Sequence, residues 1–108
     1  MKGDGNMTRE ECLEQAKACV CTDRNRQYGS PEDNFCLIAK LWQDYLHEVL
    51  HGVAGIDDAE ILPEDVANMM ILLKIARNAT GLRPTADGFI DIAGYAACGC
   101  EIATGGKR

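Results

Sequence analysis

Apolar residues recur along this chain at intervals of three and four, the spacing that places side chains on one face of a helix. They outline four segments, at residues 10–21, about 30–50, 63–79 and 87–104. The second segment has the most regular row, made by Phe35, Ile38, Trp42, Tyr45 and Val49. The pattern predicts amphipathic helices, and it predicts that this row faces a core.

Residues that favour helix starts precede each segment. Thr8 with Glu11 three positions later forms a capping-box pattern, and Ser30 stands before Pro31 as a helix cap. Pro63 opens the third segment, and Thr85 is the expected cap of the fourth. Residues 52–62 and the "TGLRPT" segment, residues 80–85, are expected to be loops.

Very little of the chain alternates polar and apolar residues with the period of a strand, and no internal repeat is visible. Helices joined by short loops favour an antiparallel arrangement. The sequence therefore predicts an all-α fold, an antiparallel bundle of four main helices, in one domain over residues 1–108. We expect disorder at residues 1–7 and 105–108. The third and fourth helices are apolar around so much of their circumference that we also expect a homo-oligomer.

The charge of the chain restricts its partners. A formal net charge of −6 argues against broad binding to nucleic acid or to an anionic membrane. The longest strictly apolar run, residues 69–73, is too short to span a bilayer, and residues 1–11 lack the apolar centre of a signal peptide. We therefore expect a cytoplasmic protein with no membrane partner.

Six cysteines without a secretory signal predict free thiols rather than a disulfide framework. The two C-x-C pairs, Cys19 with Cys21 and Cys98 with Cys100, fall on expected helices. Residues two apart on a helix point in nearly opposite directions, so neither pair is expected to hold one zinc ion.

The segment "HEVLH", residues 47–51, matches the H-E-x-x-H zinc pattern, in which two histidines bind the metal and the glutamate acts as a base. By helical phase, however, His47 and His51 lie opposite the apolar row of their helix. We therefore expect both histidines to face solvent at a helix end, which favours a solvated end over a zinc protease and leaves open whether His47, Glu48 and His51 ever bind a metal.

Carboxylates within apolar helices are candidates for chemistry. Asp87 and Asp91 lie four residues apart on the fourth helix, where burial would require a cation, a basic side chain or a metal. A metal or ligand role and a simple pairing of Asp91 with a basic residue are both open. Asp65 lies within the apolar arc of the third helix, but it could also cap its own helix.

Up-and-down topology would bring the start of the second helix, the end of the third and the start of the fourth to one end of the bundle. The residues expected there are Arg24, Arg26, Tyr28, Asn34, Lys74, Arg77, Asp87 and Asp91. Cations and paired carboxylates around one pocket suit a nucleotide or another phosphate-bearing ligand, with Mg²⁺ held by the aspartates. Asp65 would lie at the other end of the bundle, unless Asp65 of a second subunit lies at this pocket.

Three segments, "RNRQYGSPEDNFCLIAKLW", "DVANMMILLKIAR" and "DGFIDIAGYAA", resemble a family of short all-helical proteins of unknown function carried by phages and prophages. The resemblance covers residues 12 to about 101. That family is in turn similar to the MazG-like all-α nucleoside triphosphate pyrophosphohydrolases. This second resemblance implies a dimer or tetramer that hydrolyses nucleoside triphosphates to monophosphates and pyrophosphate with Mg²⁺.

The MazG-like metal pattern is only partly present. "DVANMMILLKIAR" resembles its second block and places Asp65 at the metal-binding aspartate, but the glutamate three residues earlier is Leu62 here. The E-x-x-E block expected on the preceding helix is absent from its core-facing side, where Asn34 and Phe35 stand nearest. Hydrolysis requires a metal ion to offset the phosphate charge. The missing acidic residues therefore put catalysis in doubt, while nucleotide binding remains possible.

Two classes of function follow. In the first, a nucleotide-binding protein or MazG-like hydrolase, Asp65, Asp87 and Asp91 hold Mg²⁺. The phosphates of the bound nucleotide contact Arg24, Arg26, Lys74 and Arg77, and the base or ribose of the nucleotide contacts Tyr28 and Asn34. In the second, the chain is a non-catalytic phage accessory protein that binds a host protein or sequesters a nucleotide signal, as anti-defence or anti-CRISPR proteins do.

Overall fold

A computed structural model describes residues 6–23 and 30–105 of the chain, and this part contains helices and no strand. Its elements are α1 (Arg9–Ala18), the π-helix η2 (Cys19–Asp23), α3 (Pro31–Val49), the 3₁₀ turn η3 (Ile56–Asp58), α4 (Pro63–Thr80) and α5 (Ala86–Gly105). The all-α fold class is therefore confirmed. The expectation of disordered ends falls mostly outside the described residues, although Gly105 is the last residue of α5.

The helix starts follow the capping residues of the sequence. The backbone N–H of Glu11 donates to Thr8 Oγ1 over 3.1 Å, and the N–H of Thr8 donates to Glu11 Oε1 over 2.9 Å. This pair satisfies two N–H groups that have no partner inside α1. Ser30 Oγ likewise accepts the N–H of Asp33 at the start of α3. The predicted starts are thus confirmed to within one residue.

The first helix differs from the expected run over residues 10–21, because α1 changes at Cys19 into the π-helix η2. The wider π turn carries Val20 against the backbone of α5. A Cβ atom added to Gly94 would lie only 2.9 Å from Val20 Cγ1, so the glycine permits this close packing. Helical periodicity contains no signal for one extra residue in a turn.

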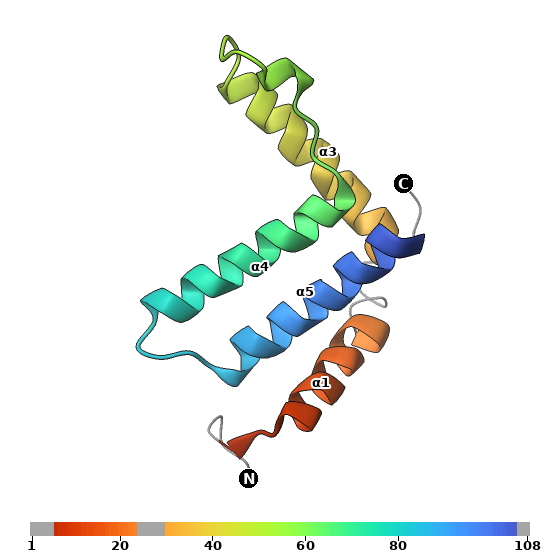
Figure 1. Ribbon diagram of the computed structural model, residues 1–108, viewed down its shortest axis with the longest axis vertical. Helices are drawn as coiled ribbons and strands as arrows, with labels where there is room; N and C mark the ends of the chain where they lie inside the picture. Colours follow the sequence, from red (N-terminus) through yellow and green to blue (C-terminus); the bar gives the residue numbers. More distant parts are fainter. Residues whose placement is uncertain (1–5, 24–29, 106–108) are drawn as a thin grey trace.

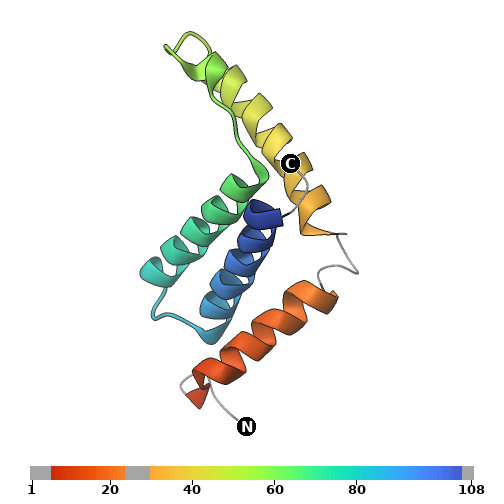
Figure 2. The ribbon, with the colours of Figure 1, turned by 45° about the vertical axis from the view of Figure 1, so that its right-hand side comes forward.

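The helices α4 and α5 form an antiparallel hairpin, and α1 lies along the side of α5 that faces away from α4 (Figures 1 and 2). The two hairpin helices approach closely near Gly99. A Cβ added there would lie 3.0 Å from Cβ of Ala67, which is 2% exposed. Small side chains therefore set the spacing of the hairpin, as the alanine- and glycine-rich sequence of α5 suggests.

The buried core lies where the first half of α3 meets the start of α4 and the end of α5. Its members are Phe35, Ala39, Val66, Ala67, Cys98 and Ile102. The ring of Phe35 also contacts that of Tyr95, with centroids 6.3 Å apart. The start of α3 is thereby fixed at one end of the hairpin, the end that contains Pro63 and Ile102.

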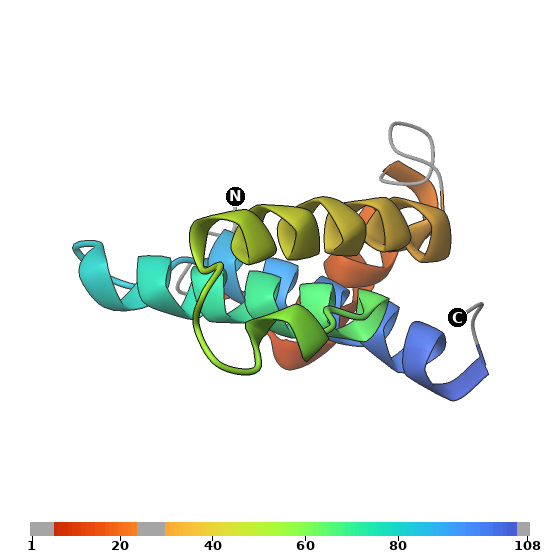
Figure 3. The ribbon, with the colours of Figure 1, turned by 90° about the horizontal axis from the view of Figure 1, so that it is seen from above.

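This placement corrects the up-and-down topology expected from the sequence. After α3 the loop turns back, so that α4 begins beside the middle of α3 rather than beside its end (Figures 1 and 3). The side-chain Oε1 of Gln43 accepts the backbone N–H of Ile61 over 2.7 Å and holds this return. The start of α3 therefore lies far from the α4–α5 turn, and the second half of α3 projects beyond the hairpin (Figure 1).

Because α3 projects beyond the hairpin, only part of its apolar row is buried. Phe35 is fully buried, but Tyr45 is 67% and Val49 50% exposed. Periodicity identified the row correctly and could not show that only its first half finds a partner within the chain. The homo-oligomer stays a prediction.

Candidate functional site

An open cavity of about 500 Å³ lies at the turn between α4 and α5. Its walls come from the last two turns of α4, the connecting segment and the first turns of α5. The lining residues are Lys74, Arg77, Asn78, Gly81, Leu82, Arg83, Thr85, Asp87, Gly88 and Asp91. The structure thus brings together four of the predicted site residues, Lys74, Arg77, Asp87 and Asp91.

The start of α5 is fixed by Thr85, whose Oγ1 accepts the N–H of Gly88 over 3.1 Å. This cap confirms the role expected for Thr85 and orients the first turn of α5 toward α4. A Cβ atom on Gly88 would overlap the side-chain amide of Asn78. A larger residue at position 88 would therefore require the side chain of Asn78 to move.

Lys74 and Asp91 form an ion pair across the cavity wall, with 2.8 Å between Nζ and Oδ2. The side chains are 19% and 39% exposed, so the lysine is the more shielded partner. The sequence left open whether Asp91 binds a ligand or pairs with a basic residue. The structure shows the pairing.

Two arginines provide further positive charge at the cavity. Arg77 and Arg83 are both exposed, and neither forms an ion pair within residues 6–23 and 30–105. Asp87, in the first turn of α5, is also exposed. Three cations therefore face two carboxylates here, and one carboxylate already neutralises one of the cations.

Sequence reasoning missed Arg83, Asn78 and Leu82 as cavity residues. The signal was present in "TGLRPT", because a short connection between antiparallel helices lies at the same end as the helix termini that it joins. Periodicity assigns faces to helices and is silent on loops, so it could not select these residues.

Two predicted site residues lie away from the cavity. Asp65 is at the opposite end of α4, where its Oδ2 accepts the N–H of Leu62 over 2.9 Å. This is the helix-capping alternative considered for Asp65. Asn34 lies in the first turn of α3 and does not line the cavity, because α3 begins at the other end of the hairpin. The predicted residues Arg24, Arg26 and Tyr28 lie outside the described residues.

The predicted magnesium ligands do not assemble within one chain. Asp65 caps the first turn of α4, whereas Asp91 is paired with Lys74 in the second half of that helix, and Asp87 lies one turn of α5 further away. Among the described residues, no three acidic, histidine or cysteine side chains are grouped to hold a metal ion. One aspartate with one lysine-bound neighbour is a poor fit to Mg²⁺, which requires octahedral oxygen ligands. A complete Mg²⁺ site would need the second subunit considered above.

The H-E-x-x-H segment uses its histidines for backbone contacts. His47 Nε2 lies 2.9 Å from the carbonyl oxygen of Ala59, and His51 Nδ1 lies 2.9 Å from the carbonyl oxygen of Glu48. A carbonyl oxygen only accepts, so each of these nitrogens carries the proton and is not free to bind metal. Through its hydrogen bond to Ala59, His47 holds the loop that follows α3 against that helix.

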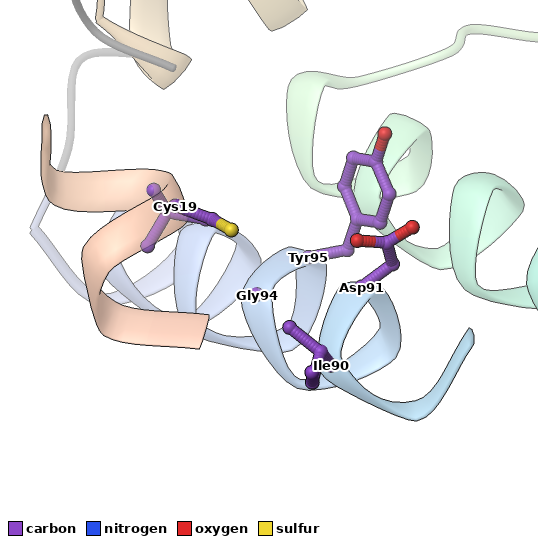
Figure 4. A pocket seen from close by; sticks show the side chains of 6 residues that line it. Cys19, Ile90, Asp91, Gly94 and Tyr95 are labelled. Atoms are coloured by element: carbon purple, nitrogen blue, oxygen red, sulfur yellow. The ribbon is translucent and has the colours of Figure 1, made fainter. Parts of the chain in front are cut away.

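None of the six cysteines, which all lie within the described residues, forms a disulfide, and Cys98 is the buried one. A second cavity of about 110 Å³ lies between η2 and α5 and is lined in part by Cys19, Asp91 and Tyr95. Figure 4 shows Asp91 and Tyr95 leaving α5 on the same side, with the sulfur of Cys19 directed toward that helix. This cavity is below the range of several hundred Å³ that is usual for small-molecule sites.

The described helices include none that combines the length and the apolar character needed to cross a membrane.

Comparison with known proteins places the chain among phage sequences. Residues 11–103 match a family profile described as a domain of unknown function, DUF6378. The chain is 43% identical over 90 residues to the gene 55 protein of Mycobacterium phage D29, covering 82% of this chain and 51% of that protein. It is 41% identical over 85 residues to the gene 55 protein of Mycobacterium phage L5, covering 78% of this chain and 47% of that protein.

The chain therefore spans about half the length of these two relatives. No solved structure matches it. The resemblance to an all-helical phage family is confirmed by the profile match and by both relatives. The more distant resemblance to MazG-like hydrolases stays a prediction.

Proposed function

We propose that this chain, which belongs to the family defined by the DUF6378 domain, binds a nucleoside phosphate in the cavity at the α4–α5 turn. The observation that carries the proposal is the concentration of positive charge there. Arg77 and Arg83 line one open cavity, and neither is engaged in an ion pair within the described part of the chain.

Arginine is suited to this role because its planar guanidinium donates two parallel hydrogen bonds to a phosphate group. Arg77 comes from the last turn of α4 and Arg83 from the connecting segment, so the pair can hold one phosphate from two directions. The amino end of α5 adds partial positive charge at the same place. In a chain of net charge −6, such a local excess of cations requires a reason.

The remaining lining supports a nucleoside rather than inorganic phosphate alone. A volume of about 500 Å³ lies within the range of roughly 300–1,000 Å³ that is usual for organic ligands. Leu82, whose side chain is fully exposed, offers an apolar surface for a base. The amide of Asn78 and the carboxylate of Asp87 offer hydrogen bonds to a base or ribose.

The proposal is limited to binding by the single chain. Metal-assisted hydrolysis of a triphosphate requires carboxylates that place Mg²⁺ and the attacking water. In this chain Asp91 is paired with Lys74, and Asp65 caps the far end of α4. We therefore expect bound triphosphate to remain intact, and pyrophosphate release would point to a site completed by a second subunit.

Thermal stability with a panel of ribonucleotides and deoxyribonucleotides tests the proposal, with Mg²⁺ or with a chelator, alongside an assay for released pyrophosphate. We expect at least one nucleotide to raise the melting temperature, without pyrophosphate. The double variant Arg77→Ala with Arg83→Ala removes two charge-assisted contacts of about 1.5–3 kcal/mol each. Its affinity should fall by about a hundredfold or more.

The matched control is Lys40→Ala, which removes an exposed cation on α3, away from the cavity. It should bind as the unmodified chain does. If no nucleotide changes the melting temperature, or if the double variant binds as well as the control, the proposal is wrong.

The second class of function, a non-catalytic phage accessory protein, uses the same cavity if it sequesters a nucleotide signal. A melting-temperature shift without pyrophosphate is the result expected of such a protein. An accessory protein that binds a host protein is also possible. A different observation favours it, namely the large apolar side chains that are exposed on α3 and α4.

A further inference from the structure

The negative charge of this chain is concentrated in one segment, α3 with the loop that follows it. Residues 31–60 contain seven acidic residues and one lysine, a formal charge of −6 with the histidines neutral, whereas the rest of the chain contains ten acidic and ten basic residues. The net charge of the protein therefore belongs to this segment, which we call the α3 arm. The outer part of the arm extends away from the α4–α5 hairpin (Figure 1).

The α3 arm also carries an exposed strip of apolar side chains. Leu37 is 57%, Leu41 56%, Tyr45 67% and Val49 50% exposed. These residues are four apart on α3, so they follow one another along one side of the helix, and we call them the apolar strip. At a rise of about 1.5 Å per residue the strip is about 18 Å long, which matches about three turns of a partner helix.

Carboxylates lie along one edge of the apolar strip. Asp44 follows Leu41 by three residues and Glu48 follows Tyr45 by three, so each carboxylate neighbours a member of the strip. Both acidic residues are exposed. Asp44 also pairs with Lys40, with 3.8 Å between Nζ and Oδ2 and both side chains more than half exposed. Such a surface pair contributes little, so Asp44 stays accessible to a cation of a partner.

The loop after α3 adds further negative charge beside the same edge. His47 Nε2 donates to the carbonyl oxygen of Ala59 over 2.9 Å and holds the loop against α3. Because His47 follows Asp44 by three residues, the loop lies on the side of α3 next to this carboxylate. The exposed acidic residues of the loop are Asp57, Asp58 and Glu60. The apolar strip is therefore bordered on one side by acidic residues of both the helix and the loop.

We propose that the α3 arm binds a partner protein that presents a basic amphipathic helix. The apolar side of that helix covers the apolar strip, and its lysines and arginines face the carboxylates beside the strip. This inference gives a chemistry to the partner of an accessory protein. It does not depend on nucleotide binding, because the residues that line the cavity at the α4–α5 turn lie outside the arm.

The charge of the arm selects this occupant over the alternatives. Nucleic acid and anionic lipid carry phosphate groups that the arm repels. A second copy packed arm against arm would bring two segments of charge −6 together, and like charges across an interface oppose association. With a basic helix, the apolar contact supplies affinity, while the opposite charges speed its approach and fix its orientation.

Titration of the full chain with a synthetic peptide tests the proposal, followed by fluorescence anisotropy and by NMR. The peptide has about 18 residues, enough to form a helix, with leucines on one side and lysines on the other. One control peptide has the same composition in scrambled order, and another has glutamate in place of each lysine. We expect the first peptide to bind about tenfold or more tightly than either control. The shifted amides should lie within residues 37–60.

Two variants of the arm separate the apolar and the charged contributions. Leu41→Ala with Tyr45→Ala removes apolar contact and should weaken peptide binding by about tenfold or more. Asp44→Asn with Glu48→Gln removes two charges beside the apolar strip. This second variant should weaken binding by about threefold or more at low salt, and the difference should disappear at high salt because ions screen exposed charges.

The matched control is Glu14→Gln with Glu101→Gln, which removes the same charge from exposed positions on α1 and α5. It should bind the peptide about as the unmodified chain does. Circular dichroism verifies that every variant keeps its helix content, which is expected because the changed side chains are exposed.

Three results of the titration would overturn the proposal. They are no binding of the first peptide, equal binding of the scrambled peptide, and an equal effect of the control and the arm variants. Amide shifts centred outside residues 37–60 would also overturn it. A stable dimer in light scattering that the arm variants dissociate would assign the apolar strip to a second copy instead.

Discussion

The spacing of the α4–α5 hairpin depends on the absence of a side chain at Gly99. A Cβ at this position would lie 3.0 Å from Cβ of Ala67, whereas carbon atoms in contact lie about 3.5–4.0 Å apart. The variant Gly99→Ala therefore forces the two helices to separate or slide, at the interface that places Lys74 opposite Asp91. We expect it to destabilise the protein.

The magnitude is the difference between two opposing effects. Overpacking a buried contact costs about 1–3 kcal/mol, and alanine stabilises a helix by about 1 kcal/mol relative to glycine. Gly99→Ala should therefore lower the free energy of unfolding by up to about 2 kcal/mol. In a chain that carries Ala67→Gly the overlap is relieved, and Gly99→Ala should then raise the free energy of unfolding by about 1 kcal/mol. The coupling between the two positions is thus about 1–3 kcal/mol.

A double-mutant cycle measured by urea denaturation gives this coupling directly. The control is Gly105→Ala, at the end of α5, where an added Cβ meets nothing within 4 Å. It should leave stability unchanged or raise it slightly. If Gly99→Ala stabilises the protein equally in the unmodified chain and in the chain that carries Ala67→Gly, the helices are not in close contact and the reasoning is wrong.

Two further changes test the core and the cavity. Phe35→Ala removes a fully buried ring and should lower the free energy of unfolding by about 3–5 kcal/mol; a loss below about 1 kcal/mol in urea denaturation would show that α3 does not pack as described. Asp91→Asn breaks the pair with Lys74 and should cost about 0.5–1 kcal/mol of stability. It should also tighten nucleotide binding about threefold, since removing a negative charge about 6 Å from a phosphate is worth about 0.7 kcal/mol. Calorimetric titration measures this, and weaker binding would instead support a metal role for Asp91.

Local structure was predictable because its causes are local. Thr8, Ser30 and Thr85 cap the helices that they precede, and Pro63 begins α4. Each signal acts over three or four residues, within the reach of sequence patterns. The π turn at η2 was not predictable, because a single inserted residue leaves the apolar spacing almost unchanged.

The packing of α3 depends on contacts that no periodic pattern encodes. Tyr45 and Val49 belong to the same row as Phe35, but the loop after α3 returns to the middle of the helix and leaves them without a partner. The length of this loop permitted either arrangement. The choice depends on long-range contacts between Phe35 and the hairpin, which the sequence alone does not specify.

The same long-range choice decided which site residues meet. Lys74, Arg77, Asp87 and Asp91 belong to two helices joined by one short turn, so their convergence followed from the antiparallel connection alone. Asn34 depended on the placement of α3 and lies elsewhere. The convergence that required one loop is present in the structure, whereas the placement of Asn34 beside these residues, which required the whole topology, is not.

Mapping a nucleotide by NMR tests the central claim most directly, with backbone amide shifts recorded as the best ligand of the thermal panel is added. The account predicts that the perturbed amides lie in residues 74–91, with the glycines at 81 and 88 among them. Shifts clustered at the starts of α3 and α4, near Asn34 and Asp65, would contradict it. So would binding that leaves residues 74–91 unchanged.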